Sequence, residues 1–258
     1  MSVFARIWKL FKPEAIPGLA AGLYNKTARR LIPELCHGFV EDVVKQLPAG
    51  RLLDVGTGPG YVPIEIARRS KEVFVDGIDL TERMIELARI NAQEAHLEDR
   101  LSFQVGDGKE MGFKDESYDM IISTASLHHW KDAAKVFNEM YRVLRPGGEA
   151  WVLDPCKDST DREIDEFLEK IYKIVQPGFI RRLWISFFMR REIKLDAYSQ
   201  AEVEEIVKGT RFNGCSIERD GAFMVIKLKK ETSAKSLFGG QIDVPSPLMG
   251  EGEGGGDY

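Results

Sequence analysis

The stretch LLDVGTGPGYV, residues 52–62, decides the fold, because a buried apolar strand ends there in an acid and three closely spaced glycines. Gly56, Gly58 and Gly60 follow a G-x-G-x-G pattern, which permits a tight turn and close approach of the backbone to a ligand. The helix expected to begin near Tyr61 directs its free N–H groups to the same place. Such a turn suits an adenosyl ligand. A dinucleotide site would read G-x-G-x-x-G, and here the third glycine comes one residue early.

Four further segments follow in the order that one α/β ligand site requires. EVFVDGIDL, residues 72–80, predicts a second strand that ends at Asp79, 23 residues beyond Gly56. A carboxylate there can accept hydrogen bonds from both hydroxyls of a ribose. Thr81 then predicts the N-cap of an amphipathic helix through about Ala95. Three more strands are predicted in LSFQVGDG (101–108), in YDMIISTASLHHW (118–130) and, after a helix end and a Pro-Gly-Gly turn, in RVLRPGGEAWVLDP (142–155).

These motifs, over about residues 24–155, resemble those of the class I S-adenosylmethionine-dependent methyltransferases. Within that family the chain is similar to the small-molecule branch that includes the quinone-biosynthesis C-methyltransferases. The resemblance implies an α/β, Rossmann-like, doubly wound fold whose mostly parallel seven-stranded sheet has an antiparallel C-terminal hairpin strand. It also implies S-adenosyl-L-methionine as cofactor and a small molecule as methyl acceptor.

The C-terminal part of the chain agrees with that fold. CSIERDGAFMVIKLKK, residues 215–230, predicts two strands joined at Asp220 and Gly221. Before them, Ser199 and Glu202 predict a capping box for a helix through about residue 208.

The resemblance also assigns cofactor contacts, beginning with the methionine part. The three glycines of the loop would lie near this part, with Gly56 and Gly58 directly beside it and Asp54 supporting the loop. Ser123 stands where the family uses a strand-end carbonyl near the methionine amine. Tyr24 matches an aromatic residue that often closes the cofactor pocket.

The nucleoside part has its own set of implied contacts. Asp79 resembles the ribose ligand, and Leu80 and Met84 would pack near the adenine. Asp107 is similar to the acid that meets the adenine amino group, with the backbone of Gly108 beside it. Taken alone, an acid at a strand end is often only a cap or turn residue, but acids at successive strand ends favour a ligand site.

Three side chains at the predicted strand-end rim are candidates for a catalytic base, namely His128, His129 and Asp154. Imidazole titrates near neutral pH, although a histidine in a loop can equally be a solvated turn residue. The mechanism that the resemblance implies is in-line attack of an acceptor atom on the sulfonium methyl. Proximity and alignment supply much of the acceleration in such a reaction, so a base is optional.

Composition limits the partners of the chain. Its 258 residues, 43% hydrophobic and 30% charged, suffice for one substantial core. A net charge of -5 gives no general attraction to nucleic acid. The sequence STAS at 123–126 also differs from the Asn-Pro-Pro-Tyr type that marks methylation of base amines in the family. Cys36, Cys156 and Cys215 are isolated, which predicts a reducing, cytoplasmic location, no disulfide and no metal site.

We divide the chain into an N-terminal amphipathic segment (1–23), a methyltransferase domain (24–230) and a disordered tail (231–258) rich in Gly, Pro and acidic residues. No run of roughly eighteen apolar residues predicts a membrane span. The N-terminal segment is interpreted as a cover for the core or the cofactor pocket. The alternatives are an amphipathic helix on a membrane surface and a signal peptide, which its prolines and acidic residue disfavour.

A long insertion at 155–198 is the expected place for substrate selection, because a segment that leaves a strand end can roof the pocket. Within it, FIRRLWISFFMRR (179–191) places aromatic residues at helical spacing among arginines. Core packing, a lid over a lipophilic substrate and contact with an anionic membrane all fit this pattern. Together with the N-terminal segment, it leads to the hypothesis of a hydrophobic acceptor, such as a quinone precursor or a lipid-like molecule.

Two other classes of function compete with a methyltransferase. A nicotinamide-dependent oxidoreductase shares the sheet, but the spacing of the glycines and the GDG strand end disfavour it. A non-catalytic module that binds an adenosyl ligand to regulate or scaffold a partner has the same motifs. The acceptor atom and the oligomeric state stay open at this point.

Overall fold

A seven-stranded sheet forms the centre of the molecule. The computed structural model describes residues 18–232, with side chains from residue 25 onward. The strand order is β3-β2-β1-β4-β5-β7-β6, and every pairing is parallel except those of β7 with β5 and β6. This confirms the predicted fold class. The strands are β1 (Ala49–Val55), β2 (Glu72–Asp79), β3 (Leu101–Val105), β4 (Tyr118–Thr124), β5 (Leu144–Pro155), β6 (Ser216–Asp220) and β7 (Phe223–Lys229).

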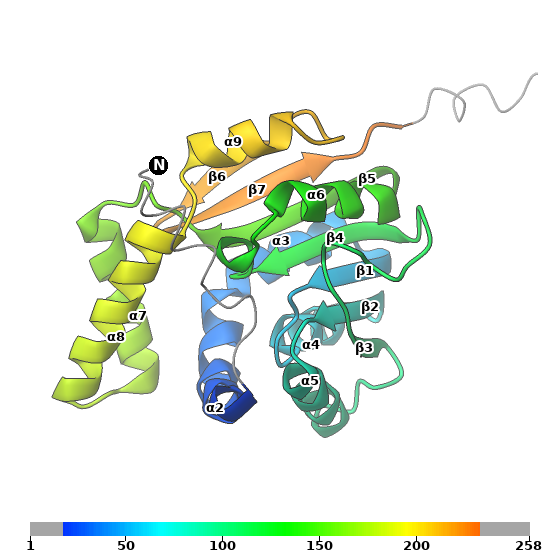
Figure 1. The fold of residues 1–258 in the computed structure, drawn as a ribbon. Helices are drawn as coiled ribbons and strands as arrows, with labels where there is room; N and C mark the ends of the chain where they lie inside the picture. Colours follow the sequence, from blue (N-terminus) through cyan, green and yellow to red (C-terminus); the bar gives the residue numbers. More distant parts are fainter. Residues whose placement is uncertain (1–17, 233–258) are drawn as a thin grey trace, which may run out of the picture.

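Helices cover both faces of the sheet, so its central strands bury apolar side chains on both faces. Successive residues of β1 point to opposite sides: Leu52 packs into one buried core and Leu53 into the other. Helices α3 (His37–Gln46), α4 (Tyr61–Arg69) and α5 (Glu82–Glu94) contribute to the first core, while α6 (Ala133–Val143) and α9 (Gln200–Lys208) contribute to the second (Figure 1).

The order of the strands fixes where a ligand can bind. The chain runs outward from β1 through β2 to β3, and then returns to the other side of β1 with β4. In open α/β sheets, ligands bind beyond the carboxyl ends of the strands at such a switch point. The ends of β1, β2 and β4 therefore define the expected ligand site.

Most of the caps and turns predicted from local sequence patterns are present in the structure. The capping box of Ser199 and Glu202 is present at the start of α9, and the predicted hairpin turns at Gly221 between β6 and β7. Thr81 occupies the N-cap position of α5, yet its side chain makes no capping hydrogen bond.

One predicted turn is instead part of a strand. The Pro-Gly-Gly sequence lies inside β5 as a bulge, where the pairing register with β4 jumps and Gly147 adopts a φ of 83°. The glycine makes this conformation accessible.

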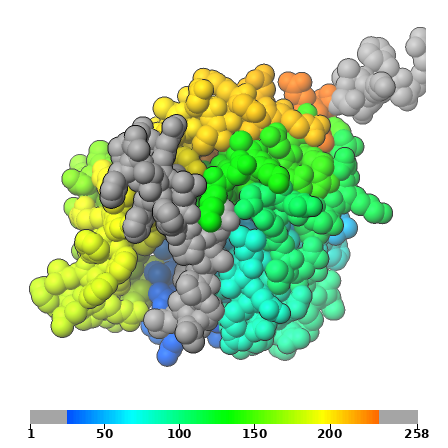
Figure 2. Space-filling view, in the orientation of Figure 1, coloured from blue at the N-terminus to red at the C-terminus, as the bar shows by residue number. Residues whose placement is uncertain are grey.

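The segment between β5 and α9 contains α7 (Asp161–Val175), α8 (Phe179–Arg191) and a π-helical turn, η2 (Glu192–Asp196). Helix α7 packs against α2 (Gly18–Leu35) as well as α8. The α7–α8 hairpin projects from the side of the sheet in Figure 1 and forms a protrusion at the left of the space-filling view in Figure 2.

Some predictions fall outside the described residues. These are the tail beyond residue 232 and the amphipathic character of the N-terminal segment, of which only the backbone from Gly18 is described. Within the described part of the chain, no helix combines the length and the apolar character that a membrane crossing requires.

Candidate functional site

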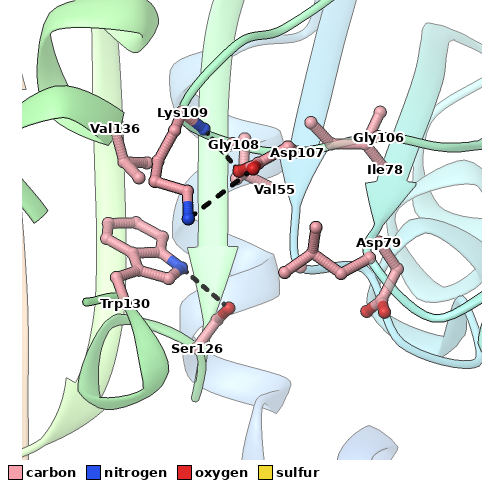
Figure 3. Close-up of a pocket in the computed structure, with 12 residues that line it drawn as sticks. Val55, Ile78, Asp79, Gly106, Asp107, Gly108, Lys109, Ser126, Trp130 and Val136 are labelled. Atoms are coloured by element: carbon pink, nitrogen blue, oxygen red, sulfur yellow. Dashed lines mark hydrogen bonds and ion pairs between the residues drawn. The ribbon is translucent and has the colours of Figure 1, made fainter. Parts of the chain in front are cut away.

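A cleft opens at the carboxyl ends of the four neighbouring strands β1, β2, β3 and β4. Five of the residues implied by the resemblance line it, namely Gly56, Asp79, Leu80, Asp107 and Gly108. Figure 3 shows the side chains that converge on this cleft. Residues from the ends of three strands therefore meet in this cleft.

The glycine loop lies against the segment that follows β4. Gly56 has a φ of 79°, and a Cβ atom there would lie 2.8 Å from the Cβ of Ser126 and closer still to its hydroxyl. Backbone N–H groups of Gly56 and Thr57 both donate to the carbonyl of Ile78, each at 2.9 Å. Gly56 thus lets the loop pass close to two neighbouring segments, as a ligand cradle requires.

The other two glycines of the loop have different surroundings. Gly58 also has a positive φ, 52°, but a Cβ atom there would meet nothing within 4 Å. At Gly60 a Cβ atom would meet Phe103 and Ala88, so the absence of a side chain there serves packing of α4 on the sheet. Neither residue lines the cleft.

Asp79 is the last residue of β2, and its carboxylate holds the glycine loop by a hydrogen bond. Its Oδ2 accepts the backbone N–H of Gly58 at 2.9 Å, and its Oδ1 accepts that of Thr81 at 2.8 Å. Burial raises the pKa of Asp79, while these two hydrogen bonds act in the opposite direction. Each oxygen keeps a further lone pair, so the carboxylate can accept two hydroxyl donors from a ligand.

Asp54 lies beneath the loop with no exposed surface. Neither of its carboxylate oxygens has a hydrogen-bond partner within residues 18–232. Burial raises the pKa of Asp54 from its ordinary 3.8 to about 7; the Thr57 hydroxyl opposes this rise and the charge of Asp79 adds to it. The position of Asp54 just before the glycine turn fits its expected role in supporting a ligand loop.

At the adenine end expected from the sequence, Asp107 and Gly108 line the cleft together with Lys109. The Asp107 carboxylate accepts the backbone N–H of Lys109 at 2.9 Å, and the Lys109 ammonium lies 3.6 Å from its other oxygen (Figure 3). Leu80 lines the same cleft with 40% of its surface exposed. An apolar side chain beside a carboxylate suits an aromatic base that carries an amino group.

Two other expected contacts lie elsewhere. Met84 is buried in α5 against Leu87. Ser123 is buried near the end of β4, where its hydroxyl donates to the carbonyl of Val55 at 2.6 Å. Neither lines the cleft. Tyr24 lies in α2, and its side chain is outside the described residues.

The candidate base residues form one cluster, in which His128 and Asp154 are buried and His129 is partly exposed. His128 Nδ1 lies 3.1 Å from both oxygens of Asp154, whose carboxylate also accepts the His128 backbone N–H at 3.2 Å. His128 Nε2 lies 2.8 Å from Oε1 of Glu192, the first residue of η2. The rings of His128 and His129 are 4.1 Å apart between centroids. Burial lowers the pKa of His128, but the carboxylates of Asp154 and, to a smaller extent, Glu192 outweigh burial and raise this pKa to about 9.

Sequence reasoning missed three residues at the site. Ser126 and Trp130 line the cleft on either side of the histidine pair, and the Trp130 indole donates to the Ser126 hydroxyl at 3.2 Å (Figure 3). Both residues lie just after the end of β4, and their position beyond a strand end could have marked them as residues of a ligand site. Glu192 follows the arginine-rich helix, and no local pattern connects it to the histidines.

Comparison with known proteins decides the family. A family model described as a methyltransferase domain matches residues 47–187, which is more than half of the chain. The chain belongs to the class I S-adenosylmethionine-dependent methyltransferase family. The cofactor of this family is S-adenosyl-L-methionine, and the cleft lies where the family motifs converge.

The chain is 36% identical over 117 residues to a ubiquinone/menaquinone biosynthesis C-methyltransferase, UbiE, of Geotalea daltonii, covering 45% of this chain and 50% of that protein. It is 30% identical over 173 residues to an ajmaline N-methyltransferase of Rauvolfia serpentina. That match covers 63% of this chain and 59% of that protein. The chain thus spans about half the length of these curated relatives. The fold is shared with the crystal structure of a putative S-adenosyl-L-methionine-dependent methyltransferase from Methanococcus maripaludis. The TM-score is 0.67 and the sequence identity 23%, and the match covers 86% of this chain and 96% of that chain.

Replacing two loop glycines separates backbone strain from crowding. Gly56→Ala places a methyl group against Ser126, so we expect it to lower the free energy of unfolding by about 3 kcal/mol, from a left-handed backbone plus steric overlap. Gly58→Ala is the matched control, with a positive φ but open space, and should cost about 1 kcal/mol. Urea unfolding measures both values. Equal costs would show that the contact with Ser126 does not constrain the loop.

The buried Asp54 carboxyl predicts a dependence of stability on pH. The folded protein keeps the Asp54 proton up to about pH 7, whereas the unfolded chain loses it near 3.8. Between these values the folded state binds more protons, so the free energy of unfolding should fall as pH rises. Asp54→Asn should flatten this fall. Urea unfolding at several pH values between about 4 and 8 tests it; parallel curves for the two proteins would refute the assignment.

Proposed function

We propose that this protein transfers the methyl group of S-adenosyl-L-methionine to a small-molecule acceptor. The observation that carries the proposal is the convergence of Gly56, Asp79 and Asp107 on one cleft at the switch point of the sheet. Membership of the family supplies the cofactor. An oxidoreductase that uses a nicotinamide is disfavoured by that membership, and by the same glycine spacing that disfavours it in the sequence.

The residues of the cleft suit the separate parts of the cofactor. Asp79 would accept the ribose hydroxyls, while Leu80 and Asp107 would hold the adenine. The loop at Gly56, supported by Asp54, would hold the methionine part, and Ser123 and Tyr24 stay candidates at its edge. The fit rests on the Asp79 carboxylate, whose oxygens each keep a lone pair at the cleft, and on Leu80 and Asp107 beside it.

When bound, the cofactor supplies an electrophilic methyl group on a sulfonium that is already activated. The task of the protein is therefore to hold the acceptor in line with that group and to exclude water. Buried polar groups at the rim are suited to orient the acceptor. His129 and Asp154 stay candidates for a base. Asp154 and Glu192 raise the pKa of His128, which makes this imidazole a proton donor more readily than a base.

We further propose that the 155–198 insertion forms a lid that selects a lipophilic acceptor. Six large apolar side chains of α8 repeat at spacings of one and four residues, which places them on one side of the helix, and all are exposed: Phe179, Ile180, Leu183, Trp184, Phe187 and Phe188. Core packing is therefore not what these side chains do in this structure.

The other side of α8 is fixed to α7. Arg190 pairs with Asp161 and Asp165, and Arg182 lies 4.4 Å from the ring centroid of Tyr172. Ile185 and Met189 of α8 pack against the small core that contains Ile164 and Leu168 of α7, so apolar and charged contacts together hold the hairpin. The six large apolar side chains named above stay exposed. An exposed apolar surface of this extent favours contact with a lipophilic molecule, or with an anionic membrane that supplies one.

Binding of the cofactor tests the proposed function. We expect S-adenosylhomocysteine, the demethylated product, to bind the wild-type protein, and Asp79→Ala to weaken binding roughly 10- to 100-fold, because charge-assisted hydrogen bonds contribute about 1.5 to 3 kcal/mol. Asp99→Ala, which changes an exposed acid outside the cleft, is the control and should bind normally. Calorimetry at one temperature measures all three. Undiminished binding by folded Asp79→Ala, or binding of NADH alone, contradicts the proposal.

Acceptor choice tests the lid. With cofactor labelled in its methyl group, we expect transfer to phenols with apolar substituents and little to phenols with charged ones. The double variant Trp184→Ala/Phe188→Ala removes a stacked pair, 5.1 Å between centroids, and should raise KM for the apolar phenols roughly tenfold. Phe74→Ala, an exposed aromatic on β2, is the control. Preference for charged phenols would refute the lid, and cofactor binding without any transfer would favour a non-catalytic module.

A further inference from the structure

Three metal-ligating side chains converge beside the cleft. His128 and His129 belong to η1 (Leu127–His129), the short helix after β4, and Glu192 opens η2. One ligand atom from each lies within 4.8 Å of the others. Ser126 and Trp130, which flank η1 in the chain, both line the cleft. The cluster therefore lies at the same rim of the sheet as the cofactor site.

Asp154 orients the central ligand. Both of its oxygens lie 3.1 Å from His128 Nδ1, and the carboxylate is fully buried. A carboxylate on Nδ1 keeps the hydrogen on that nitrogen and turns Nε2 toward the remaining ligands. Histidines that bind metal ions almost always have such a partner, which fixes the tautomer and makes the imidazole a better ligand. Nε2 points to Glu192, 2.8 Å away.

We propose that His128, His129 and Glu192 bind a divalent transition-metal ion, Zn²⁺ or a close chemical relative, with Asp154 supporting His128 from behind. Two imidazoles and one carboxylate are a donor set that such ions accept, whereas Mg²⁺ and Ca²⁺ prefer oxygen ligands alone. Three protein ligands leave a fourth position for water or substrate.

Metal binding would require the three ligand atoms, which lie within 4.8 Å of one another, to adjust. Two ligand atoms on a tetrahedral zinc ion lie about 3.3 Å apart when each bond is about 2.0 to 2.1 Å long. The pair at 2.8 Å must therefore separate by about half an ångström. Glu192 is the member that can move, because its side chain is 30% exposed and begins a π-helical turn, a feature that is frequent at functional sites.

The site would define the acceptor more closely, an inference that rests on the proposed function. A metal ion with an open position binds a hydroxyl oxygen and lowers its pKa, so that the oxygen is held as an anion and its proton passes to solvent. An acceptor with a phenol or enol hydroxyl fits this chemistry. Such an oxygen can itself take the methyl group, or it can make the carbon next to the C–O carbon nucleophilic, and that carbon then loses its proton to solvent after methylation. In both cases the C–S bond electrons return to sulfur.

Cobalt binding tests the site directly. Full-length protein without an affinity tag, stripped with a chelator, is titrated with Co²⁺ while the visible absorption is followed, and Zn²⁺ is then added as a competitor. We expect one equivalent of Co²⁺ to bind with a spectrum of nitrogen and oxygen ligation, and Zn²⁺ to displace it. Glu192→Gln and His129→Gln should each weaken binding at least tenfold.

Control variants keep the test decisive. His37 and His96 are the two other histidines of the chain, so His37→Gln/His96→Asn should bind Co²⁺ as the wild type does. Thermal unfolding and binding of S-adenosylhomocysteine without metal are measured on every variant. Normal cofactor binding without stoichiometric Co²⁺ binding rejects the metal site and leaves the proposed function standing. A thiolate spectrum, or equal binding by Glu192→Gln, also overturns the inference.

Discussion

The carboxylate of Asp79 connects two strand-to-helix turns, and the cleft depends on that connection. One oxygen holds the backbone of Gly58 after β1, and the other holds that of Thr81 after β2. Gly56 completes the arrangement, since its missing side chain lets the same loop approach Ser126 after β4. Three neighbouring strands thereby direct their ends to one place. A charge at that point is costly to bury unless donors surround it, and the two N–H groups supply them.

Much of this could be predicted from the sequence, because the signals were local. The glycine pattern at 52–62, the acid at Asp79 and the GDG at the end of β3 each mark a strand that ends and a turn that begins. The capping box at Ser199 is equally local, since its two partners lie three residues apart. The order of strands along the chain then determined which ends would meet.

Features that depend on distant contacts could not be predicted. The Pro-Gly-Gly sequence reads as a turn, yet pairing with β4 extends β5 through it as a bulge. Thr81 has the residue type of a cap, but the Asp79 carboxylate takes the backbone N–H of Thr81 and its hydroxyl caps nothing. The aromatic residues of α8 fit a core by spacing, whereas the hairpin with α7 leaves them exposed. Glu192 reaches His128 only because the 155–198 insertion folds back on the rim.

The central claim is that one cleft at the switch point of the sheet binds the cofactor, with Asp79 at its ribose. A crystal structure of the protein with S-adenosylhomocysteine tests it most directly. We predict both ribose hydroxyls within hydrogen-bond distance of the Asp79 carboxylate, the adenine beside Leu80 and Asp107, and the loop at Gly56 in its present conformation. A ligand bound outside this cleft, or a ribose without contact to Asp79, would contradict the account.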